Sequence, residues 1–481
     1  MTMDYSSLFL DGAWLAPRSA ERITVRSAST EEVLGSVPDA GEADADRAVF
    51  AARRAFDDPL GWSRWTGRQR AEVLEKLADA LETRRDEMAR RVSSQNGMPI
   101  TMAAAGEADL PVWLLRHFAG VAAVTNVEHA QPSMRGGTTW VLREALGVVA
   151  AITPWNAPQS LASFKYAPAL AAGCTVVIKP SPETVLDANL LAEAAADAGL
   201  PPGVLNVLPA GRDTSRYLVA HPEVDKIAFT GSTATGRAIA EVCGRLLRPA
   251  TLELGGKSAA VFLDDVDLTA PGLNVRLASA LLGHTGQTCY LGTRVLVPRG
   301  RHDEITEYLA AFVSSLEIGD PLDPATQLGP LVTAAHRDRV EGFIERGRAD
   351  GGTLVTGGGR PAGQPTGWYL EPTVFTGLDR DSVVAREEIF GPVLTVLPYA
   401  DDDDAVRIAN DSPYGLGGSV WTADPERGHG VARRVRTGTI GINGYRVDPG
   451  APFGGMKDSG LGRELGPAAL AGFQEVKAVY G

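Results

Sequence analysis

The most regular pattern in the chain lies between residues 148 and 230, where short apolar runs alternate with stretches of helical periodicity. The runs are rich in Val and Ile and cover residues 148–152, 175–178, 204–208 and 226–229. Continuous β-branched runs are typical of strands buried on both faces of a parallel sheet. The region therefore predicts a doubly wound sheet, with a ligand site where Asn156, Lys179 and Gly231 follow the carboxyl ends of strands.

The chain on either side shows other periodicities. Residues 1–40 read as short strands and turns, and residues 44–92 carry apolar positions at helical spacing, which predicts amphipathic helices packed on a sheet. A second alternating region runs from residue 258 past 439. It contains a predicted strand at 293–297, a helix at 302–316 and a glycine-rich hairpin at 351–365. We therefore expect two α/β domains.

Composition narrows the classes of protein that fit this pattern. The 481 residues are too many for one hydrophobic core, and 44% hydrophobic with 22% charged residues is ordinary for a soluble globular protein. A net charge of −13 argues against nucleic-acid binding, which needs clustered Lys and Arg. No stretch resembles a membrane span or an export signal, so no membrane partner is expected.

The cysteines and histidines indicate a compartment and argue against metal chemistry. Cys174, Cys243 and Cys289 are odd in number and widely spaced, which fits a reducing compartment, so we expect a cytoplasmic protein without disulfides. The seven histidines are scattered, and His284 has no partner at ligand spacing. No catalytic metal is predicted.

Cys289 lies in a setting that favours chemistry. It stands in the segment Gly-Gln-Thr-Cys-Tyr-Leu-Gly at 286–292, whose glycines leave room for a substrate. Taken alone it is equally well explained as a packed core thiol. Two other residues favour a chemical role. Asn156 stands in a turn flanked by prolines, and Glu253 stands beside two glycines. Thiol, amide and carboxylate form a set suited to acyl transfer, here in a cleft between the two domains.

The segment after the run at 226–229 predicts a phosphate site. It contains Gly231 and Ser232 and opens a helix, so its backbone N–H groups can meet a diphosphate at the positive helix end. It is not the three-glycine dinucleotide fingerprint, and a plain helix N-cap also explains it. Lys179 adds a cation at the neighbouring strand end, although lone lysines are usually solvated.

Seven ordered motifs span essentially the whole chain. They are Pro154-Trp155-Asn156, Ile178-Lys179-Pro180-Ser181, Phe229-Thr230-Gly231-Ser232, Glu253-Leu254-Gly255-Gly256-Lys257, Gly286-Gln287-Thr288-Cys289, Glu387-Glu388-Ile389-Phe390-Gly391-Pro392-Val393 and Pro452-Phe453-Gly454-Gly455-Met456-Lys457. In content and order they resemble the aldehyde dehydrogenase superfamily, whose members oxidise aldehydes to carboxylic acids with NAD(P).

The resemblance implies a mechanism through a cysteine thioester. Cys289 looks like the nucleophile that attacks the aldehyde to give a thiohemiacetal, and Asn156 looks like the oxyanion donor, together with the backbone N–H of Cys289. Hydride then passes to nicotinamide. Glu253 resembles the base that activates water to hydrolyse the thioester. Lys165 and Glu464 match positions of a proton relay.

The resemblance also implies the cofactor contacts. Lys179 is similar to the adenosine-ribose ligand, Ser232 to the diphosphate contact and Glu388 to the carboxylate on the nicotinamide ribose. The expected cofactor-binding residues are Ile152, Thr153, Pro154, Trp155, Lys179, Ser181, Pro182, Gly231, Ser232, Thr235, Leu254, Gly255, Glu388 and Phe390.

One departure bears on the choice of cofactor. NAD-preferring relatives often carry a Glu three residues after the lysine, which accepts hydrogen bonds from the ribose 2′-hydroxyl, and here Pro182 stands at that place. The missing carboxylate removes a repulsion against a 2′-phosphate, whereas Glu183 next door can compensate. We expect NAD, with NADP as the alternative.

The predicted substrate pocket departs from aromatic-lined relatives. Ala157 stands where bulkier side chains often occur and Asp448 replaces one near the mouth, which predicts a wider, more polar tunnel unless other loops refill the space. Remaining aromatic walls would suit a bulky or ring-bearing aldehyde. The expected lining is Ala157, Leu161, Phe164, Thr288, Tyr290, Asp448 and Phe453.

The domain organisation also follows from the resemblance. It implies an α/β fold with a Rossmann-like cofactor-binding domain, an α/β catalytic domain and a small β bridging or oligomerisation element. The expected ranges are 1–122 and 141–255 for the first, 256–454 for the second, and 123–140 with 455–481 for the third. Strand character at residues 138–142 predicts sheet extension in a homodimer or homotetramer.

Two alternatives to a hydrolytic aldehyde dehydrogenase are open. A CoA-acylating semialdehyde dehydrogenase would pass the acyl group to CoA, but such relatives commonly lack the carboxylate of Glu253. A catalytically silent homologue would keep the fold alone, against which the intact Cys289, Asn156 and Glu388 argue. Neither the aldehyde nor the pathway can be named from the sequence.

Overall fold

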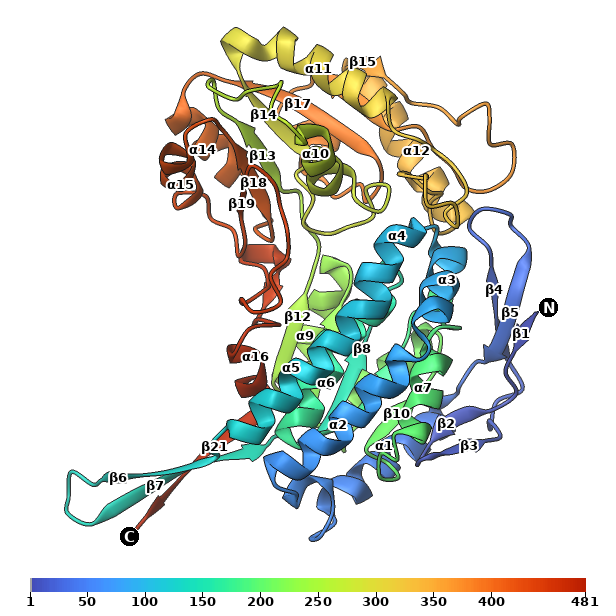
Figure 1. Ribbon diagram of the computed structural model, residues 1–481, viewed down its shortest axis with the longest axis vertical. Coiled ribbons are helices and arrows are strands. Elements are labelled where there is room, and N and C mark those ends of the chain that lie inside the picture. Colours follow the sequence, from blue (N-terminus) through green and yellow to red (C-terminus); the bar gives the residue numbers. More distant parts are fainter. Residues whose placement is uncertain (1) are drawn as a thin grey trace.

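The computed structural model describes residues 2–481 and consists of two α/β lobes and a protruding β arm (Figure 1). The predicted apolar runs form the centre of an eight-stranded sheet in the lower lobe of Figure 1. Its parallel strands are β8 (Val148–Ile152), β9 (Thr175–Lys179), β10 (Leu205–Val207), β11 (Lys226–Thr230) and β12 (Ala250–Glu253).

The strand order β20-β12-β11-β8-β9-β10-β2-β3 places a topological switch point between β8 and β11. The chain adds β9 and β10 in turn on one side of β8. It then crosses the sheet and adds β11 and β12 on the other side. Ligands of doubly wound sheets bind at such a point, at the carboxyl ends of the strands. Three further strands are antiparallel to their neighbours: β2 (Leu8–Leu10), followed by the edge strand β3 (Ala13–Leu15), and β20 (Gly460–Leu461) at the opposite edge.

Helices cover both faces of this sheet. One face carries α1 (Glu42–Asp57), α8 (Arg212–Ala220) and α9 (Thr233–Leu246), and the other carries α6 (Pro158–Ala172) and α7 (Ala188–Asp197). A further layer on the second face holds α2 (Gly67–Glu82), α3 (Arg85–Asn96), α4 (Ile100–Ala103), a π-helical turn (Ala104–Asp109) and α5 (Leu110–Val124).

The predicted packing of helices 44–92 on the sheet is correct for α1 and wrong for α2. The apolar stripe of α2, which includes Leu74, Leu77 and Leu81, packs chiefly on α5, with α6 and α7 beneath it. Periodicity reveals a buried face but not its partner, and here another helix provides that partner.

The upper lobe contains a seven-stranded sheet of order β15-β16-β17-β14-β13-β18-β19, parallel except for β15. Its strands are β13 (Ala259–Phe262), β14 (Arg294–Pro298), β15 (Thr353–Thr356), β16 (Thr373–Thr376), β17 (Val393–Tyr399), β18 (Gly418–Trp421) and β19 (Gly441–Ile442). Its helices are α10 (Leu273–Leu282), α11 (His302–Ser314), α12 (Ala334–Ala349), α13 (Val383–Arg386), α14 (Asp402–Asn410) and α15 (Pro425–Ala432).

The glycine-rich hairpin predicted at 351–365 is longer in the structure. Only β15 lies inside that range, and it pairs antiparallel with β16, so the connection runs over residues 357–372. Pro361, Pro365 and Pro372 interrupt this connection, and proline has no N–H to give to a strand ladder.

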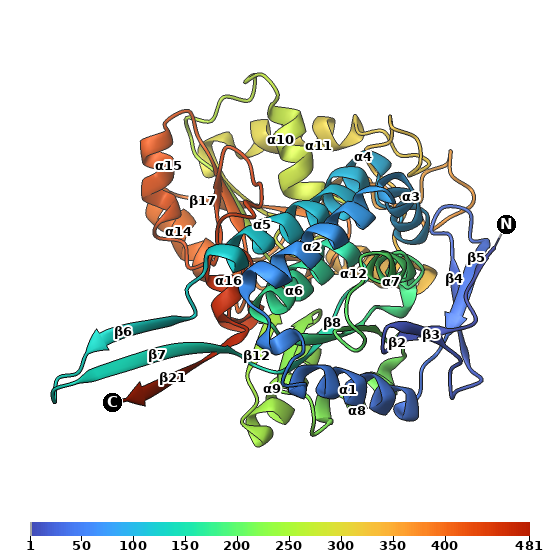
Figure 2. The same cartoon turned by 60° about the horizontal axis from the view of Figure 1, so that its bottom comes forward.

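The arm is a three-stranded antiparallel sheet that projects away from both lobes (Figure 2). It consists of β6 (Glu128–Pro132), β7 (Thr138–Ala145) and β21 (Gln474–Tyr480), preceded by the short helix α16 (Ala468–Ala471). Another small sheet, β1 (Met3–Asp4), β4 (Arg22–Arg26) and β5 (Val33–Pro38), lies near the N-terminus. Among the helices of residues 2–481, none is both long and apolar enough to cross a membrane.

Candidate active site

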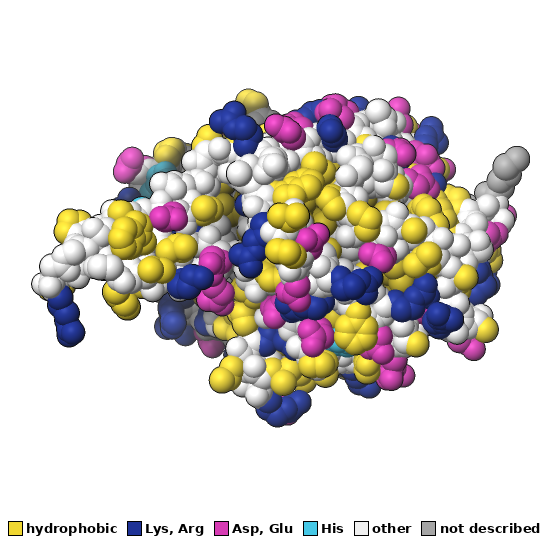
Figure 3. Space-filling view, turned by 90° about the horizontal axis from the view of Figure 1, so that it is seen from below, with side chains coloured by type: hydrophobic (Ala, Val, Ile, Leu, Met, Phe, Trp, Pro, Cys, Tyr) yellow, Lys and Arg dark blue, Asp and Glu magenta, His cyan; other side chains and the backbone are white. Residues whose placement is uncertain are grey.

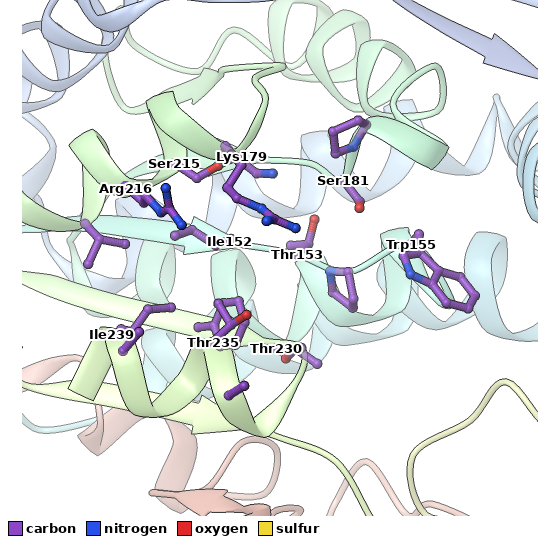
Figure 4. Close-up of a pocket in the computed structure, with 18 of the residues that line it drawn as sticks. Ile152, Thr153, Trp155, Lys179, Ser181, Ser215, Arg216, Thr230, Thr235 and Ile239 are labelled. Atoms are coloured by element: carbon purple, nitrogen blue, oxygen red, sulfur yellow. The ribbon is translucent and has the colours of Figure 1, made fainter. Parts of the chain in front are cut away.

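The carboxyl ends of four parallel strands converge on one edge of the lower sheet. A cavity of about 960 Å³ opens there, between the loops that follow β8, β9 and β11 (Figure 4). Among the expected cofactor residues, Ile152, Thr153, Pro154, Trp155, Lys179, Ser181, Pro182, Gly231 and Thr235 line it. The packing of α9 against the sheet therefore leaves a groove at the switch point of the fold.

A second cavity of about 240 Å³ continues this groove toward the upper lobe. The two cavities share Pro154, Trp155, Thr230 and Gly231 in their walls. The second is lined in addition by Asn156, Ser232, Leu254, Gly255, Cys289, His336, Arg339, Glu388 and Phe390. Residues of both lobes thus meet around one continuous groove, with Cys289 at its inner end.

The cysteine loop has an unusual backbone. Between α10 and β14, His284, Thr285 and Gly286 all have positive φ, at 52°, 55° and 78°. A Cβ on Gly286 would lie 2.1 Å from the carbonyl oxygen of Gly391, so only glycine fits there. Three consecutive left-handed residues are costly and persist where the surroundings fix them, often at functional sites. This turn sets the position of Cys289 against the other lobe.

Asn156 reaches across the interdomain groove to this loop. Its side chain is 6% exposed, and its Nδ2 donates to the carbonyl oxygen of Gln287 at 3.0 Å. Behind it, the Nδ2 of Asn96 donates to the carbonyl oxygens of Trp155 and Asn156 at 3.1 and 3.2 Å. The amide is therefore held close to Cys289, with its second N–H free of protein partners in the described chain.

Glu253 is buried at the end of β12, and neither of its carboxylate oxygens has a hydrogen-bond partner in residues 2–481. Burial raises its pKa well above the usual value, and the neighbouring carboxylate of Glu464 raises it further, while Lys165 opposes the shift. A Cβ on Gly454 would come within 2.6 Å of its Oε1. An unpaired carboxylate with a raised pKa is a suitable proton acceptor.

The environment of Cys289 favours the protonated form of its thiol. Burial raises its pKa, and the carboxylates of Glu388 and Glu253 raise it further because they disfavour a second negative charge. A thiolate must therefore form by transfer of the proton to a base, for which Glu253 is present.

A buried ion pair lies next to Glu253. The Nζ of Lys165 lies 2.8 Å from Oε1 of Glu464 and donates to Oγ1 of Thr230 at 2.6 Å, with both charged side chains at most 4% exposed. These are the two residues expected in a proton relay. Hydrogen bonds thus join Glu464 through Lys165 to Thr230 at the end of β11, and Glu253 lies beside them without a hydrogen bond to either residue.

Glu388 approaches the linker between the lobes through two glycines. Its Oε1 accepts a hydrogen bond from the N–H of Gly256 at 2.9 Å, and burial raises its pKa to about 7. A Cβ on Gly255 would lie 2.4 Å from Oε2 of Glu388, and one on Gly256 would lie 2.3 Å from the carbonyl oxygen of Cys289. Both glycines are required for this close approach.

The groove fits a dinucleotide. At one end Lys179 is buried, which lowers its pKa to about 8, and its Nζ donates to the carbonyl oxygen of Ala210 at 3.3 Å. In the middle Ser232 caps α9, whose N-terminus faces the groove. At the other end Glu388 supplies a carboxylate, and Phe390, with a φ of 62°, meets Trp155 edge-on at 5.3 Å.

Aromatic residues of the expected substrate lining pack together around Tyr290, which follows Cys289 in the chain. Phe164 meets Phe453 edge-on at 6.3 Å, and Tyr290 stacks on Tyr445 with ring centroids 4.4 Å apart. Leu161 is buried on α6 close behind Ala157, and Thr288 donates to the carbonyl oxygen of Gly283.

Asp448 is exposed beside a cavity of about 210 Å³ that Tyr445, Val447 and Phe453 also line. Its Oδ1 accepts a hydrogen bond from the N–H of Gly450 at 2.8 Å, so it caps its own loop. Tyr445 is buried and stacks on Tyr290, and Phe453 meets Tyr290 edge-on, so the surroundings of Tyr290 are aromatic.

Comparison with known proteins decides the family. The sequence model described as "Aldehyde dehydrogenase family" matches residues 14–479. The chain belongs to this family. It is therefore an NAD(P)-dependent oxidoreductase that converts aldehydes into carboxylic acids.

Curated relatives match this aldehyde dehydrogenase over its whole length. Geranial dehydrogenase of Castellaniella defragrans is 53% identical over 480 residues, which cover 100% of this chain and 99% of the relative. A 3-succinoylsemialdehyde-pyridine dehydrogenase of a Pseudomonas species is 42% identical, with 99% of each chain covered.

Solved structures of other aldehyde dehydrogenases share the fold. The Mycobacterium tuberculosis enzyme, complexed with NAD+, has a TM-score of 0.96 and 44% identity, with 100% of this chain and 99% of that chain covered. A variant of aldehyde dehydrogenase C from Pseudomonas syringae, complexed with NAD+ and octanal, has a TM-score of 0.94 and 39% identity, with 99% and 96% covered.

Several residues of the groove in this aldehyde dehydrogenase were not predicted from the sequence. Arg212, Ser215 and Arg216 on α8 line the larger cavity, and His336 and Arg339 on α12 line the smaller one. The arginines on α8 follow the carboxyl end of β10, so the strand-end rule applied to β8 and β9 could have found them. The residues on α12 come from the other lobe and carry no comparable signal.

Proposed function

We propose that the protein oxidises apolar aldehydes with NAD+ through a thioester on Cys289, with Asn156 as oxyanion donor and Glu253 as base. One observation carries this proposal. The groove lined by both lobes brings Cys289, Asn156 and Glu388 into the wall of a single cavity, next to the unpaired carboxylate of Glu253.

The first step uses the thiol, the base and the amide. Sγ of Cys289 attacks the aldehyde carbon while its proton passes to the carboxylate of Glu253, and the carbonyl oxygen becomes an alkoxide. The Asn156 amide, held at the loop by its bond to Gln287, donates to that oxygen together with the backbone N–H of Cys289. The product is a thiohemiacetal.

The second stage removes hydride and then the acyl group. The hydride leaves the thiohemiacetal carbon for the nicotinamide of NAD+, which supplies the oxidising equivalent. Once the proton from Cys289 has left Glu253, this carboxylate takes a proton from a water that attacks the thioester carbonyl and returns it to the Cys289 sulfur as the acid leaves. Lys165 and Glu464, paired at 2.8 Å, offer a route by which the proton on Glu253 moves away.

The cofactor would lie along the groove. Lys179 would hold the adenosine ribose, the N-terminus of α9 at Ser232 the diphosphate, and Glu388 the nicotinamide ribose. The complexes of two relatives with NAD+ support NAD+ as the cofactor.

The aromatic and aliphatic surroundings of Tyr290 support an apolar substrate. Phe164, Phe453 and Tyr445 surround it, and the only charged residue predicted there, Asp448, is exposed at the rim. The names of two relatives, one a geranial dehydrogenase and one bound to octanal, agree with aldehydes that carry a hydrocarbon chain. A geranial-like aldehyde is the first candidate substrate.

The proposal extends to assembly and location. The edge strand β21 and the exposed side chains of Val476, Val479 and Tyr480 support dimerisation through the arm, where Figure 3 shows hydrophobic side chains. The three sheets would correspond to a cofactor-binding unit, a catalytic unit and an oligomerisation unit. The three free cysteines support a reducing compartment such as the cytoplasm.

The experiment replaces the nucleophile. Cys289→Ala should abolish NADH formation from geranial and octanal but keep the Kd for NAD+, measured by calorimetric titration. The control is Cys174→Ala, since Cys174 is buried at the amino end of β9, away from the groove. Aldehyde-dependent NADH formation retained by Cys289→Ala would disprove the proposal, and an acyl-CoA product that forms only with CoA would reassign the acceptor.

A further inference from the structure

The first turn of α6 cannot satisfy its own backbone N–H groups. The N-cap residue Ala157 has no acceptor in its side chain, and Pro158 has no N–H group. The N–H of Leu161 donates to the carbonyl oxygen of Ala157. The buried N–H groups of Gln159 and Ser160 therefore need an acceptor from another segment, because buried backbone donors are rarely left unpaired.

Glu107 supplies this acceptor. Its Oε2 accepts hydrogen bonds from the N–H groups of Gln159 at 2.8 Å and Ser160 at 3.3 Å. The side chain is 1% exposed and comes from the π-helical turn Ala104–Asp109, a rare kind of turn that often occurs at functional sites. A negative group is also favoured at the positive N-terminus of a helix. Glu107 thus caps α6 from a distant part of the chain.

The carboxyl group of Glu107 can hold the helix with or without its proton. Burial raises its pKa to about 7. The Ser160 hydroxyl has a single proton and lies 2.6 Å from the carbonyl oxygen of Gly106 and 2.8 Å from Oε1 of Glu107. In the neutral form, Oε1 donates to this hydroxyl, which donates to Gly106, and Oε2 still accepts from the backbone. The cap therefore depends on hydrogen bonds and not on charge alone.

The cap lies next to the amide that would bind the substrate oxygen. Asn156 directly precedes the N-cap residue of α6, and its carbonyl oxygen accepts a hydrogen bond from Nδ2 of Asn96 at 3.2 Å. The Gln159 side chain donates to Oδ2 of Asp187 at 2.5 Å, but this contact does not satisfy the backbone of the first turn. The start of α6 is thus a fixed support for Asn156 only while Glu107 holds its N–H groups.

We propose that Glu107 is a positioning residue for the oxyanion site, because it fixes the first turn of α6 and through it the amide of Asn156. The inference rests on the proposed function, since it assumes that Asn156 donates to the substrate oxygen. Glu107 is not among the residues that line either cavity of the groove, so it acts through Asn156 and does not touch the substrate.

The test introduces Glu107→Ala into the wild type and into Asn156→Ala. It measures the single-turnover rate of NADH formation from octanal at saturating NAD+. In the wild type, Glu107→Ala should lower this rate about 10- to 100-fold, because a displaced donor no longer meets the substrate oxygen. In Asn156→Ala the same change should lower it less than about twofold, since the donor is already absent.

Two further variants serve as controls, and thermal unfolding shows that each folds. Glu107→Gln keeps an oxygen for the backbone and an NH2 group for the Ser160 hydroxyl, so its rate should stay within about threefold of the wild type. Asp44→Ala removes another buried carboxylate, which accepts from the N–H of Arg18 at 3.0 Å and is outside both cavities. It should lower the melting temperature and change the rate less than about twofold.

If Glu107→Ala does not fold, Glu107→Asp replaces it in both backgrounds, because its carboxyl group is one methylene too short to reach the first turn. The inference is wrong if the substitution of Glu107 leaves the wild-type rate unchanged or lowers the rate equally in both backgrounds. A loss in Glu107→Gln as large as in Glu107→Ala also contradicts it. In these cases the proposed function stands. If Asn156→Ala alone leaves the rate unchanged, the oxyanion assignment of the proposed function fails instead.

Discussion

Asn156 is held from two sides, and this fixes the direction of its amide. The bond from its Nδ2 to Gln287 and the bonds of Asn96 to the backbone at Trp155 and Asn156 leave one amide hydrogen for a substrate oxygen. Asn156→Ala should lower kcat by about two to three orders of magnitude, the usual cost of one oxyanion donor. The Kd for NAD+ should be unchanged, and a fall in kcat of less than about threefold would contradict the assignment.

Glu253 should set the acid limb of the pH profile. Only its carboxylate form accepts a proton, and its raised pKa means that this form appears at higher pH than for an ordinary glutamate. The rate of thioester hydrolysis should therefore rise with pH through that pKa. In Glu253→Gln the acid limb should vanish. Hydrolysis of the thioester should also become slower than hydride transfer, so that rapid mixing shows one burst of NADH.

A second variant tests whether the acid limb moves with the pKa of Glu253. The positive charge of Arg463 lowers the pKa of Glu253, so Arg463→Gln should move the acid limb to higher pH. A limb that stays in place in Arg463→Gln, or survives in Glu253→Gln, would assign it to another group.

At the residue scale, motif and strand position predicted which side chains come together. Lys179 and Glu253 end parallel strands, Asn156 and Gly231 follow two others, and parallel strands end at the same edge of a sheet. Arg212 was missed because an exposed arginine near a helix start has the same sequence pattern as a solvated surface residue. The strand-end rule, applied to β10 as it was to β8 and β9, would have distinguished the two cases.

At the scale of elements, the turn before Cys289 is the most constrained part of the site. Gly286→Ala should destabilise the fold by about 1–2 kcal/mol for the left-handed conformation alone. The clash with Gly391 adds to this, and a displaced Cys289 should lower kcat by about 10²-fold. Thermal unfolding and steady-state rates measure both effects. The control is Gly300→Ala, where an added Cβ meets nothing within 4 Å; equal effects of the two variants would contradict this account.

The strands were more predictable than the packing of the helices. Runs such as 148–152 and 226–229 are buried on both faces, so their composition alone identifies them. The apolar face of α2 was also predicted, but its partner α5 was not, because periodicity along one segment does not encode which distant segment covers it.

For the whole molecule, the arm makes a prediction about assembly. Gly481 and Thr138 exchange both backbone hydrogen bonds, so the alternate residues of β21, including Ala478, direct their N–H groups to the open edge. Ala478→Pro should therefore lower the mass of the proposed oligomer without breaking the pairing of β21 with β7. Light scattering coupled to size exclusion measures this, with Ala478→Thr as control. An unchanged mass for Ala478→Pro would locate the interface elsewhere.

The pairing of the strands near the predicted domain boundaries could not be inferred from local sequence patterns. The predicted bridging segment 455–481 contributes β20 to the eight-stranded sheet and β21 to the arm, and β7 extends to residue 145, past the predicted boundary at 140. Pairing of these segments depends on strands more than 200 residues away, which local patterns do not report.

The most direct test of the mechanism is to trap the acyl group. Glu253→Gln mixed with octanal and NAD+ should accumulate a thioester that acid quenching preserves. Mass spectrometry of the digested protein should then find the octanoyl mass on the peptide containing Cys289, in an amount equal to the NADH formed in the burst. NADH formation without that adduct, or an adduct on another residue, would contradict the assignment of Cys289 as the nucleophile.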